Sequence, residues 1–267
     1  MEINRFNVNC SIVFQDLNLL ERPAAAAGAG YVAIESWWPF AGPVPSTGEA
    51  RRFAEAVEEA GVALRALNLY GGEMSSGERG ILSHPTRESE FEDSLGGLDD
   101  VASRLGCRVF NALYGLRLED EEAQLETAIR RLGRLEAFAA ARDATIVLEP
   151  ISGIPGYPLR LASDVFRIID AVPGAAHVKL LADVYHLTVN EDDVEGVLEQ
   201  IERIGHVQVA DAPGRHEPGT GALPIAGWLE LLGARGYTGA IGLEYAPLED
   251  PVASLHKVKK DLIDRSS

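Results

Sequence analysis

The sequence predicts a single α/β domain over residues 1–267, folded as a closed parallel (β/α)8 barrel. Three observations predict it: eight short apolar runs, a longer amphipathic stretch after each run, and a length of 267 residues. Strand followed by helix, eight times over, is the pattern of a parallel sheet that closes on itself with its helices outside. A chain of this length forms such a barrel as one domain.

The predicted strands are apolar runs of strand length that begin near the N-terminus and recur along the whole chain. They lie at residues 6–10, 31–35, 63–69, 107–112, 144–149, 177–183, 205–209 and 239–244. The two cysteines, Cys10 and Cys107, fall within such runs. Two cysteines do not make a disulfide framework, so we expect buried, reduced thiols.

The predicted helices are amphipathic stretches between these runs. They lie at residues 16–29, 48–60, 88–105, 120–142, 159–171, 193–203, 225–235 and 250–263. In the fourth stretch Leu125, Ile129, Leu132 and Leu135 form one apolar stripe at helical spacing. Pro23 in the first stretch predicts either a kink or a helix start, because proline lacks the amide hydrogen that a helix interior needs.

Two connections are longer than a barrel requires, at residues 70–87 and 211–224. Both follow strands, so both are expected on the C-terminal face, where barrel enzymes build their active sites. Long connections at this face are usually functional.

Composition excludes several classes of function. The formal charge of −17 repels phosphate backbones, so we expect no nucleic-acid partner. No apolar stretch approaches the roughly 18 residues of a membrane span, so no membrane partner is expected. The N-terminus lacks the features of a signal peptide, which favours a cytoplasmic location. Barrels of this size often pair, so a homo-oligomer remains open.

The strongest functional signal is a set of polar side chains at the ends of the last four predicted strands. Strand interiors bury apolar residues, so an acidic residue at a strand tip needs a reason. If the four tips converge, Glu149, Asp183, Gln208 and Glu244 offer only oxygen ligands, the set preferred by a hard divalent cation such as Mg²⁺ or Mn²⁺. An imidazole in place of the Gln208 amide would favour Zn²⁺ instead.

The same four residues suggest a reaction. Glu149 and Glu244 are expected to face each other across the pocket, as a pair that moves protons. A metal held between a ketone oxygen and a neighbouring hydroxyl acidifies the intervening C–H and stabilises an enediolate. One glutamate then removes the proton and the other returns it, which is the chemistry of an aldose–ketose isomerase.

Two further residues are candidates for substrate binding. His186, three residues beyond Asp183, could bond a substrate oxygen, or be a loop histidine bonded to the backbone. Arg215 could pair with a substrate carboxylate, or be a solvated loop arginine. Residues 37–40 (Trp-Trp-Pro-Phe) predict either an aromatic wall of the pocket or a dimer contact. His206 is expected to have a structural role.

The chain resembles the hydroxypyruvate isomerase family of xylose-isomerase-like TIM barrels over nearly its whole length. The Gly-Glu-Arg-Gly motif at 77–80 and the His-x-Gln-x-Ala-Asp motif at 206–211 are specific to this branch. The resemblance also covers residues 5–6, 9, 148–151, 154–157, 183–186, 217–221 and 244–245.

The resemblance implies a divalent cation held by Glu149, Asp183, Gln208 and Glu244, with the two glutamates as the proton-transfer pair. It implies a small hydroxy-oxo acid as substrate, through interconversion of hydroxypyruvate and 2-hydroxy-3-oxopropanoate (tartronate semialdehyde). Related sugar epimerases usually have histidine at the position of Gln208, which favours the isomerase branch. Ser152 and Gly153 depart from the Asn-containing stretch expected there.

This departure leaves alternatives open within the same barrel. The substrate could be larger, as for an isomerase of the 2-oxo-tetronate type or a ketose 3-epimerase. A DNA-repair endonuclease would need several histidines for a zinc cluster, and a basic groove. A barrel that binds sugar acids without converting them is a further alternative.

Overall fold

Eight parallel strands hydrogen-bond to one another in chain order, and the last pairs with the first to close a barrel. The computed structural model describes residues 2–263. The strands are β1 (Phe6–Asn9), β2 (Ala33–Ser36), β3 (Ala63–Asn68), β4 (Val109–Asn111), β5 (Thr145–Leu148), β6 (Val178–Asp183), β7 (Ile204–Val209) and β8 (Ile241–Leu243). All eight predicted strands are therefore present, and the predicted fold is confirmed.

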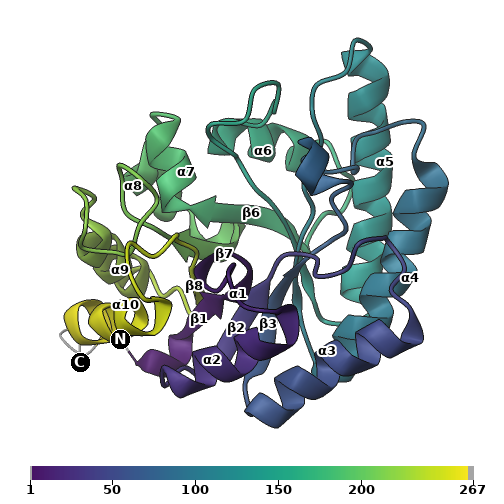
Figure 1. Cartoon of the computed structure of the whole chain (residues 1–267). Coiled ribbons are helices and arrows are strands. Elements are labelled where there is room, and N and C mark those ends of the chain that lie inside the picture. Colours follow the sequence, from purple (N-terminus) through teal and green to yellow (C-terminus); the bar gives the residue numbers. More distant parts are fainter. Residues whose placement is uncertain (1, 264–267) are drawn as a thin grey trace.

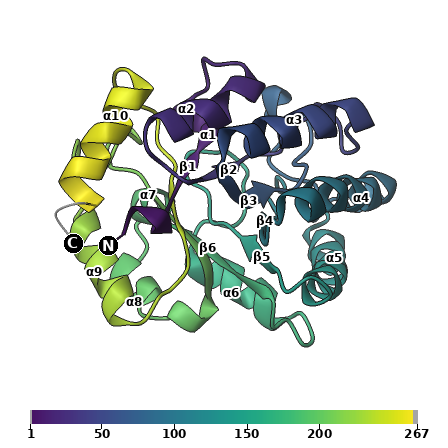
Figure 2. The ribbon, with the colours of Figure 1, turned by 90° about the horizontal axis from the view of Figure 1, so that it is seen from below.

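Helices surround the strands as an outer layer (Figures 1 and 2). The α-helices are α1 (Cys10–Val13), α2 (Arg22–Gly28), α3 (Thr47–Ala60), α4 (Glu88–Leu105), α5 (Glu121–Ala140), α6 (Ala162–Asp170), α7 (Val184–Val189), α8 (Val194–Leu198), α9 (Ile225–Ala234) and α10 (Pro251–Val258). Short 3₁₀ turns occur at η1 (Ile3–Arg5), η2 (Leu19–Glu21), η3 (Met74–Ser76) and η4 (Ile201–Arg203), and a π-helical turn at η5 (Lys259–Ile263).

The helices differ from the prediction in several details, and the predicted helices at 16–29, 193–203 and 250–263 are each divided into an α-helix and a 3₁₀ or π turn. Helices α1 and α7 were not predicted, and both begin directly at the end of a strand. Pro23 lies in the first turn of α2, so it marks a helix start rather than a kink. Leu125 on α5 is exposed, because the buried face of that helix runs instead through Ala128, Leu132 and Leu135.

Buried apolar side chains fill the space between the sheet and the helices, and both cysteines belong to this core. Burial raises the pKa of the Cys107 thiol to about 12, so the group stays protonated and unreactive. None of the helices in residues 2–263 is both long enough and apolar enough to cross a membrane.

One buried charge ties the long 70–87 connection to the helix layer. Arg131 on α5 is fully buried, donates to the main-chain oxygens of Ile81 and Leu82, and pairs with Glu88 at 2.9 Å. A buried guanidinium needs such partners, because an unpaired charge costs several kcal/mol. The end of the connection is therefore fixed to α5.

Candidate active site

The four predicted strand tips are all buried at the C-terminal end of the barrel. Asp183 ends β6 and caps α7, because its Oδ1 accepts from the Tyr185 amide at 2.9 Å. Gln208 on β7 pairs in register with Asp183. Glu149 and Glu244 directly follow β5 and β8. The parallel register thus brings the four side chains to one rim.

Glu149, Asp183 and His186 form the tightest group at this rim. Each offers a ligand atom, and these atoms lie within 4.8 Å of one another. Asn111, at the end of β4, donates its amide to Glu149 Oε2 at 2.8 Å. The two carboxylates could hold a metal ion, and His186 would join them only with its Nε2 free of hydrogen.

His186 lies on α7 rather than in a loop, and Ser152 fixes its tautomer. The Ser152 main-chain amide donates to His186 Nδ1 at 3.1 Å, and the Ser152 hydroxyl lies 2.7 Å from the same atom. Because burial lowers the pKa of His186 to about 4, the ring is neutral, and its one hydrogen is on Nε2. Nε2 lies 3.6 Å from Asp183 Oδ2 and 3.8 Å from Glu149 Oε1, too far for a hydrogen bond, so its N–H is available to a bound molecule.

A buried carboxylate that was not among the sequence-based candidates orients Gln208. Glu35 on β2 accepts from Gln208 Nε2 at 2.6 Å and from His206 Nε2 at 2.7 Å. Because a carboxylate accepts hydrogen bonds, the amide nitrogen must face Glu35. Gln208 Oε1 is left buried without a hydrogen-bond partner. His206 thus has the structural role that was predicted.

Glu35 has room inside the barrel because β8 carries Gly242 opposite it. A Cβ at position 242 would lie 2.5 Å from Glu35 Oε1 and 2.6 Å from Oε2, which no real Cβ tolerates.

Glu244 lies apart from the tightest group, beyond Arg215. The Arg215 Nη2 is 3.1 Å from Asp183 Oδ2 and 3.5 Å from Glu244 Oε1, so the guanidinium bridges the two carboxylates. Trp37, the residue after β2, donates its indole Nε1–H to Glu244 Oε1 at 2.7 Å. A pocket wall at Trp37 was one of two sequence-based expectations, but this bond, which joins residues 207 positions apart, was not foreseen.

The environment makes both glutamates weak acids. Burial, followed by the charge of Asp183, raises the pKa of Glu149 from its ordinary 4.5 to about 8. Burial also raises the pKa of Glu244 well above 4.5, against the opposing charge of Arg215. Carboxyl groups with such pKa values can take up and release protons near neutral pH.

The residues present fit a divalent cation. With all three carboxylates ionised, they and Arg215 carry a formal charge of −2 in a buried setting, which a divalent cation would neutralise. The Gln208 Oε1 has no hydrogen-bond partner among the residues described, so it is free to serve as an oxygen ligand. Oxygen donors of this kind suit hard cations.

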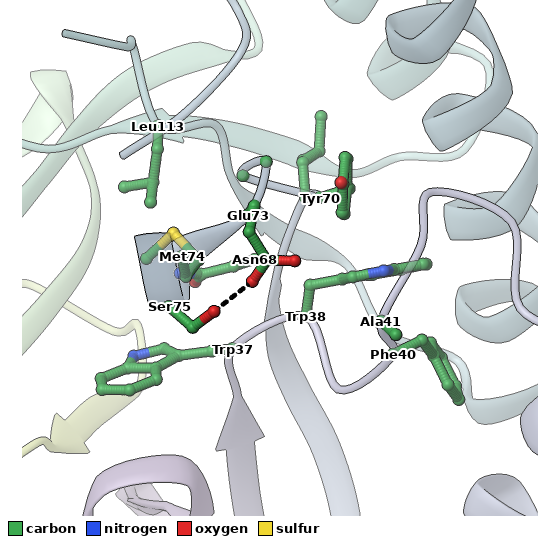
Figure 3. Close-up of a pocket in the computed structure, with 13 residues that line it drawn as sticks. Trp37, Trp38, Phe40, Ala41, Asn68, Tyr70, Glu73, Met74, Ser75 and Leu113 are labelled. Carbon is green, nitrogen blue, oxygen red and sulfur yellow. Dashed lines mark hydrogen bonds between the residues drawn. The ribbon is translucent and has the colours of Figure 1, made fainter. Parts of the chain in front are cut away.

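Two adjoining cavities open at this face. The first, of about 370 Å³, is lined by Glu149, His186, Arg215 and Glu244 together with Arg79 and Ile154. The second, of about 310 Å³, is lined by Trp37, Trp38, Phe40 and the segment that contains Met74 (Figure 3). Trp37, Asn68, Met74, Ser75 and Leu113 border both cavities. The aromatic segment at 37–40 therefore forms a pocket wall.

Comparison with known proteins finds a family model and several named isomerases that match most of this chain. A family model described as "Xylose isomerase-like TIM barrel" matches residues 23–261. A Streptomyces coelicolor protein named "Putative hydroxypyruvate isomerase" is 44% identical over 262 residues, which cover 93% of each chain. The hydroxypyruvate isomerase of Escherichia coli is 30% identical, over 94% of this chain and 96% of its own. The 2-oxo-tetronate isomerase of Cupriavidus necator is 32% identical, over 96% and 97%.

Among solved structures, the barrel superimposes on a Brucella melitensis protein named "AP endonuclease, family 2". The TM-score is 0.87 at 28% sequence identity, over 97% of this chain and 99% of the other.

Proposed function

Because this chain belongs to the xylose isomerase-like TIM barrel family, and within it resembles hydroxypyruvate isomerases, we propose that it interconverts hydroxypyruvate and 2-hydroxy-3-oxopropanoate. The named relatives confirm the predicted reaction class, an isomerase. One observation carries the mechanism: Glu149 and Glu244, both with raised pKa values, line the same cavity.

We assign the proton transfer to these two glutamates. In hydroxypyruvate the hydroxymethyl carbon, C3, is next to the ketone carbon, C2. One glutamate removes a proton from C3, which leaves an enediolate, and the other delivers a proton to C2. The second glutamate then takes the hydroxyl proton from O3, and the first gives its proton to O2, so the aldehyde forms and both glutamates return to their starting states. Arg215, between Asp183 and Glu244, and the Nε2–H of His186 are the proposed donors to the substrate oxygens.

Glu149, Asp183, Gln208 and Glu244 are the proposed ligands of one divalent cation, Mg²⁺ or Mn²⁺. When bound, this cation supplies a Lewis acid that stabilises negative charge on the substrate oxygens. The unpartnered Gln208 Oε1 supports the assignment, since an amide oxygen prefers these ions to zinc.

The test is to incubate the protein with hydroxypyruvate in D₂O and follow C3 deuteration and aldehyde formation by NMR. We expect exchange well above the enzyme-free rate with the wild type, and a loss of about 100-fold or more in Glu149→Gln and Glu244→Gln. The exposed Glu249→Gln is the matched control and should retain full rate. Undiminished activity in both variants would rule out the proposed proton transfer by the two glutamates. A wild-type protein that does not exchange the C3 protons would rule out hydroxypyruvate as the substrate.

A larger oxo-acid is the second candidate. The cavity lined by Trp37, Trp38 and Phe40 adjoins the catalytic one and offers space for a longer chain. The similarity to the 2-oxo-tetronate isomerase supports this candidate. The ratio of kcat/KM for 2-oxo-tetronate and hydroxypyruvate decides between them. A ketose 3-epimerase is disfavoured by Gln208, and assays with fructose and tagatose test it.

The name of the Brucella protein raises DNA cleavage as a further possibility. The site supports it poorly, because its tightest group contains a single histidine, His186, and the chain carries a charge of −17. Incubation with an abasic-site duplex tests this directly. The predicted cytoplasmic location and homo-oligomer stay predictions.

A further inference from the structure

We propose that Arg79, in the connection after β3, binds the carboxylate of the substrate. The inference rests on the proposed function in one respect, that the substrate is a small hydroxy-oxo acid. It assigns the recognition of the acid group to a residue outside the set of strand tips, and it leaves Arg215 to the reacting end.

The segment at 77–80 (Gly-Glu-Arg-Gly) is built around Arg79 by its neighbours. The Glu78 carboxylate pairs with Arg87 at 2.6 Å and accepts from the Glu73 amide, which closes the segment on itself. Gly80 donates its amide to Gly71 at 2.8 Å and adopts φ +109°. A Cβ at Gly80 would collide with the Leu113 main-chain oxygen, so the segment packs directly on the connection after β4.

The Arg79 side chain, unlike that of Glu78, bonds only to main-chain oxygens nearby in the described part of the chain. Its Nη1 donates to the main-chain oxygens of Met74 at 3.1 Å and Glu78 at 2.7 Å. Within residues 2–263, its Nε and Nη2 have no hydrogen-bond partner, and no carboxylate pairs with it. The two carbonyls therefore hold the guanidinium in place and leave its Nε–Nη2 edge available.

Arg79 lines the same cavity as Glu149 and Glu244. Four charged residues border this cavity in the described part of the chain: the two glutamates, Arg215 and Arg79. Arg215 already contacts Asp183 and Glu244, so its charge is balanced by the protein. Arg79 is the cation that remains for an incoming anion.

The chemistry of the substrate requires such a group. A carboxylate would be repelled by the two glutamates, and a guanidinium edge binds it through two parallel, charge-assisted hydrogen bonds. Holding the acid group at Arg79 also presents the rest of the molecule to the glutamates in a fixed orientation.

The test compares two substrates that share the reacting atoms. Hydroxypyruvate and dihydroxyacetone both carry a hydroxymethyl group next to a ketone, but dihydroxyacetone has a neutral hydroxymethyl group in place of the carboxylate. In Arg79→Gln we expect KM for hydroxypyruvate to rise about 100-fold with a smaller change in kcat, as for the loss of a bidentate ion pair. The kcat/KM for dihydroxyacetone should stay within about twofold of wild type.

Two controls accompany this variant. Arg65→Gln removes an arginine that also bonds a main-chain oxygen, that of Asn4, away from the cavity, and should leave both substrates unaffected. Arg79→Lys keeps the positive charge but cannot form the two parallel hydrogen bonds of a guanidinium, so it should recover part of the affinity. If Arg79→Gln impairs both substrates equally, or neither, the inference is overturned.

A binding measurement separates this inference from the proposed function. Calorimetric titration with D-glycerate, a three-carbon hydroxy acid, needs no turnover. If the wild type does not isomerise hydroxypyruvate but binds glycerate at least tenfold more tightly than Arg79→Gln, the carboxylate site stands and the proposed reaction fails. Equal glycerate affinity in the two proteins would refute the carboxylate site, whatever the activity.

Discussion

At the scale of single residues, the environment of Glu149 makes the stability of the protein depend on pH. Its pKa of about 8, against an ordinary 4.5, means that the folded protein retains a proton that the unfolded chain releases between these values. The stabilising contribution is therefore complete below pH 4.5 and is lost as the pH rises through 8.

We therefore expect the melting temperature of chelator-treated protein to fall between pH 5 and pH 8, and Glu149→Gln to flatten this slope. Differential scanning calorimetry in EDTA measures both. An unchanged slope in Glu149→Gln would mean that other groups dominate the pH response. A divalent cation added at pH 8 should restore stability, because it favours the ionised carboxylates.

We predict that Glu35 acts through Gln208, to which it is hydrogen-bonded, rather than on the substrate. In Glu35→Ala the Gln208 amide loses the acceptor at 2.6 Å that holds its nitrogen. We expect Mn²⁺ affinity to fall about 10- to 100-fold, as for other residues that orient metal ligands.

Manganese titration followed by electron paramagnetic resonance measures this affinity without a turnover assay. Glu35→Gln provides the matched control, because its amide oxygen can still accept from Gln208, and it should lose less affinity than Glu35→Ala. Equal Mn²⁺ affinity in wild type and Glu35→Ala would contradict the proposal that Gln208 is a metal ligand oriented by Glu35.

At the scale of elements, Arg131 anchors the connection that carries Arg79. In Arg131→Met the carbonyls of Ile81 and Leu82 lose their buried donor, and Glu88 loses one of its two arginine partners. We expect a loss of about 3 kcal/mol in the free energy of unfolding, measured by urea titration.

Arg130→Met is the matched control for this change. Arg130 pairs with the same Glu88 at 2.8 Å, but its side chain is 54% exposed. An exposed pair of this kind contributes about 0–1 kcal/mol, so Arg130→Met should change stability little. Comparable losses in the two variants would show that burial of Arg131 is not what matters.

Predictions from sequence succeeded where a long pattern existed. The eight apolar runs identified the strands, although the predicted run at 107–112 became β4 over Val109–Asn111, since pairing to both neighbours decides where a strand ends. Helix α7 was missed because it has six residues, too few for a periodic pattern, and is started by the Asp183 cap.

The residues of the candidate site also divide into those that the sequence alone could indicate and those that it could not. Its strand-tip residues interrupt apolar runs, so sequence alone could single them out. Glu35 is likewise an acidic residue at the end of a predicted strand, 31–35, so the sequence pattern indicates it as well. The bond from Trp37 to Glu244 could not be predicted, because it depends on how β2 and β8 are placed around the barrel.

At the scale of the whole molecule, charge opposes folding. With 41 acidic and 24 basic residues, like charges crowd a compact surface. Salt screens interactions beyond about 8 Å at physiological ionic strength, so it relieves this long-range repulsion more than it weakens close ion pairs.

We expect the melting temperature in EDTA to rise by a few degrees between about 10 mM and 300 mM NaCl. Choline chloride should act equally, since it adds ionic strength without a small cation that could bind the rim. A melting temperature that falls with salt would mean that surface ion pairs such as Arg104–Glu58 outweigh the net repulsion.

The contact between Gly242 and Glu35 has a consequence for how this sequence can change over generations. An alanine at position 242 would collide with the carboxylate, so it can be accepted only if the carboxylate moves away from Gln208 and His206 or position 35 becomes smaller. We therefore expect the two positions to vary together among relatives. A lineage that acquires a side chain at 242 must displace or lose the group that bonds Gln208, and with it this way of building the rim.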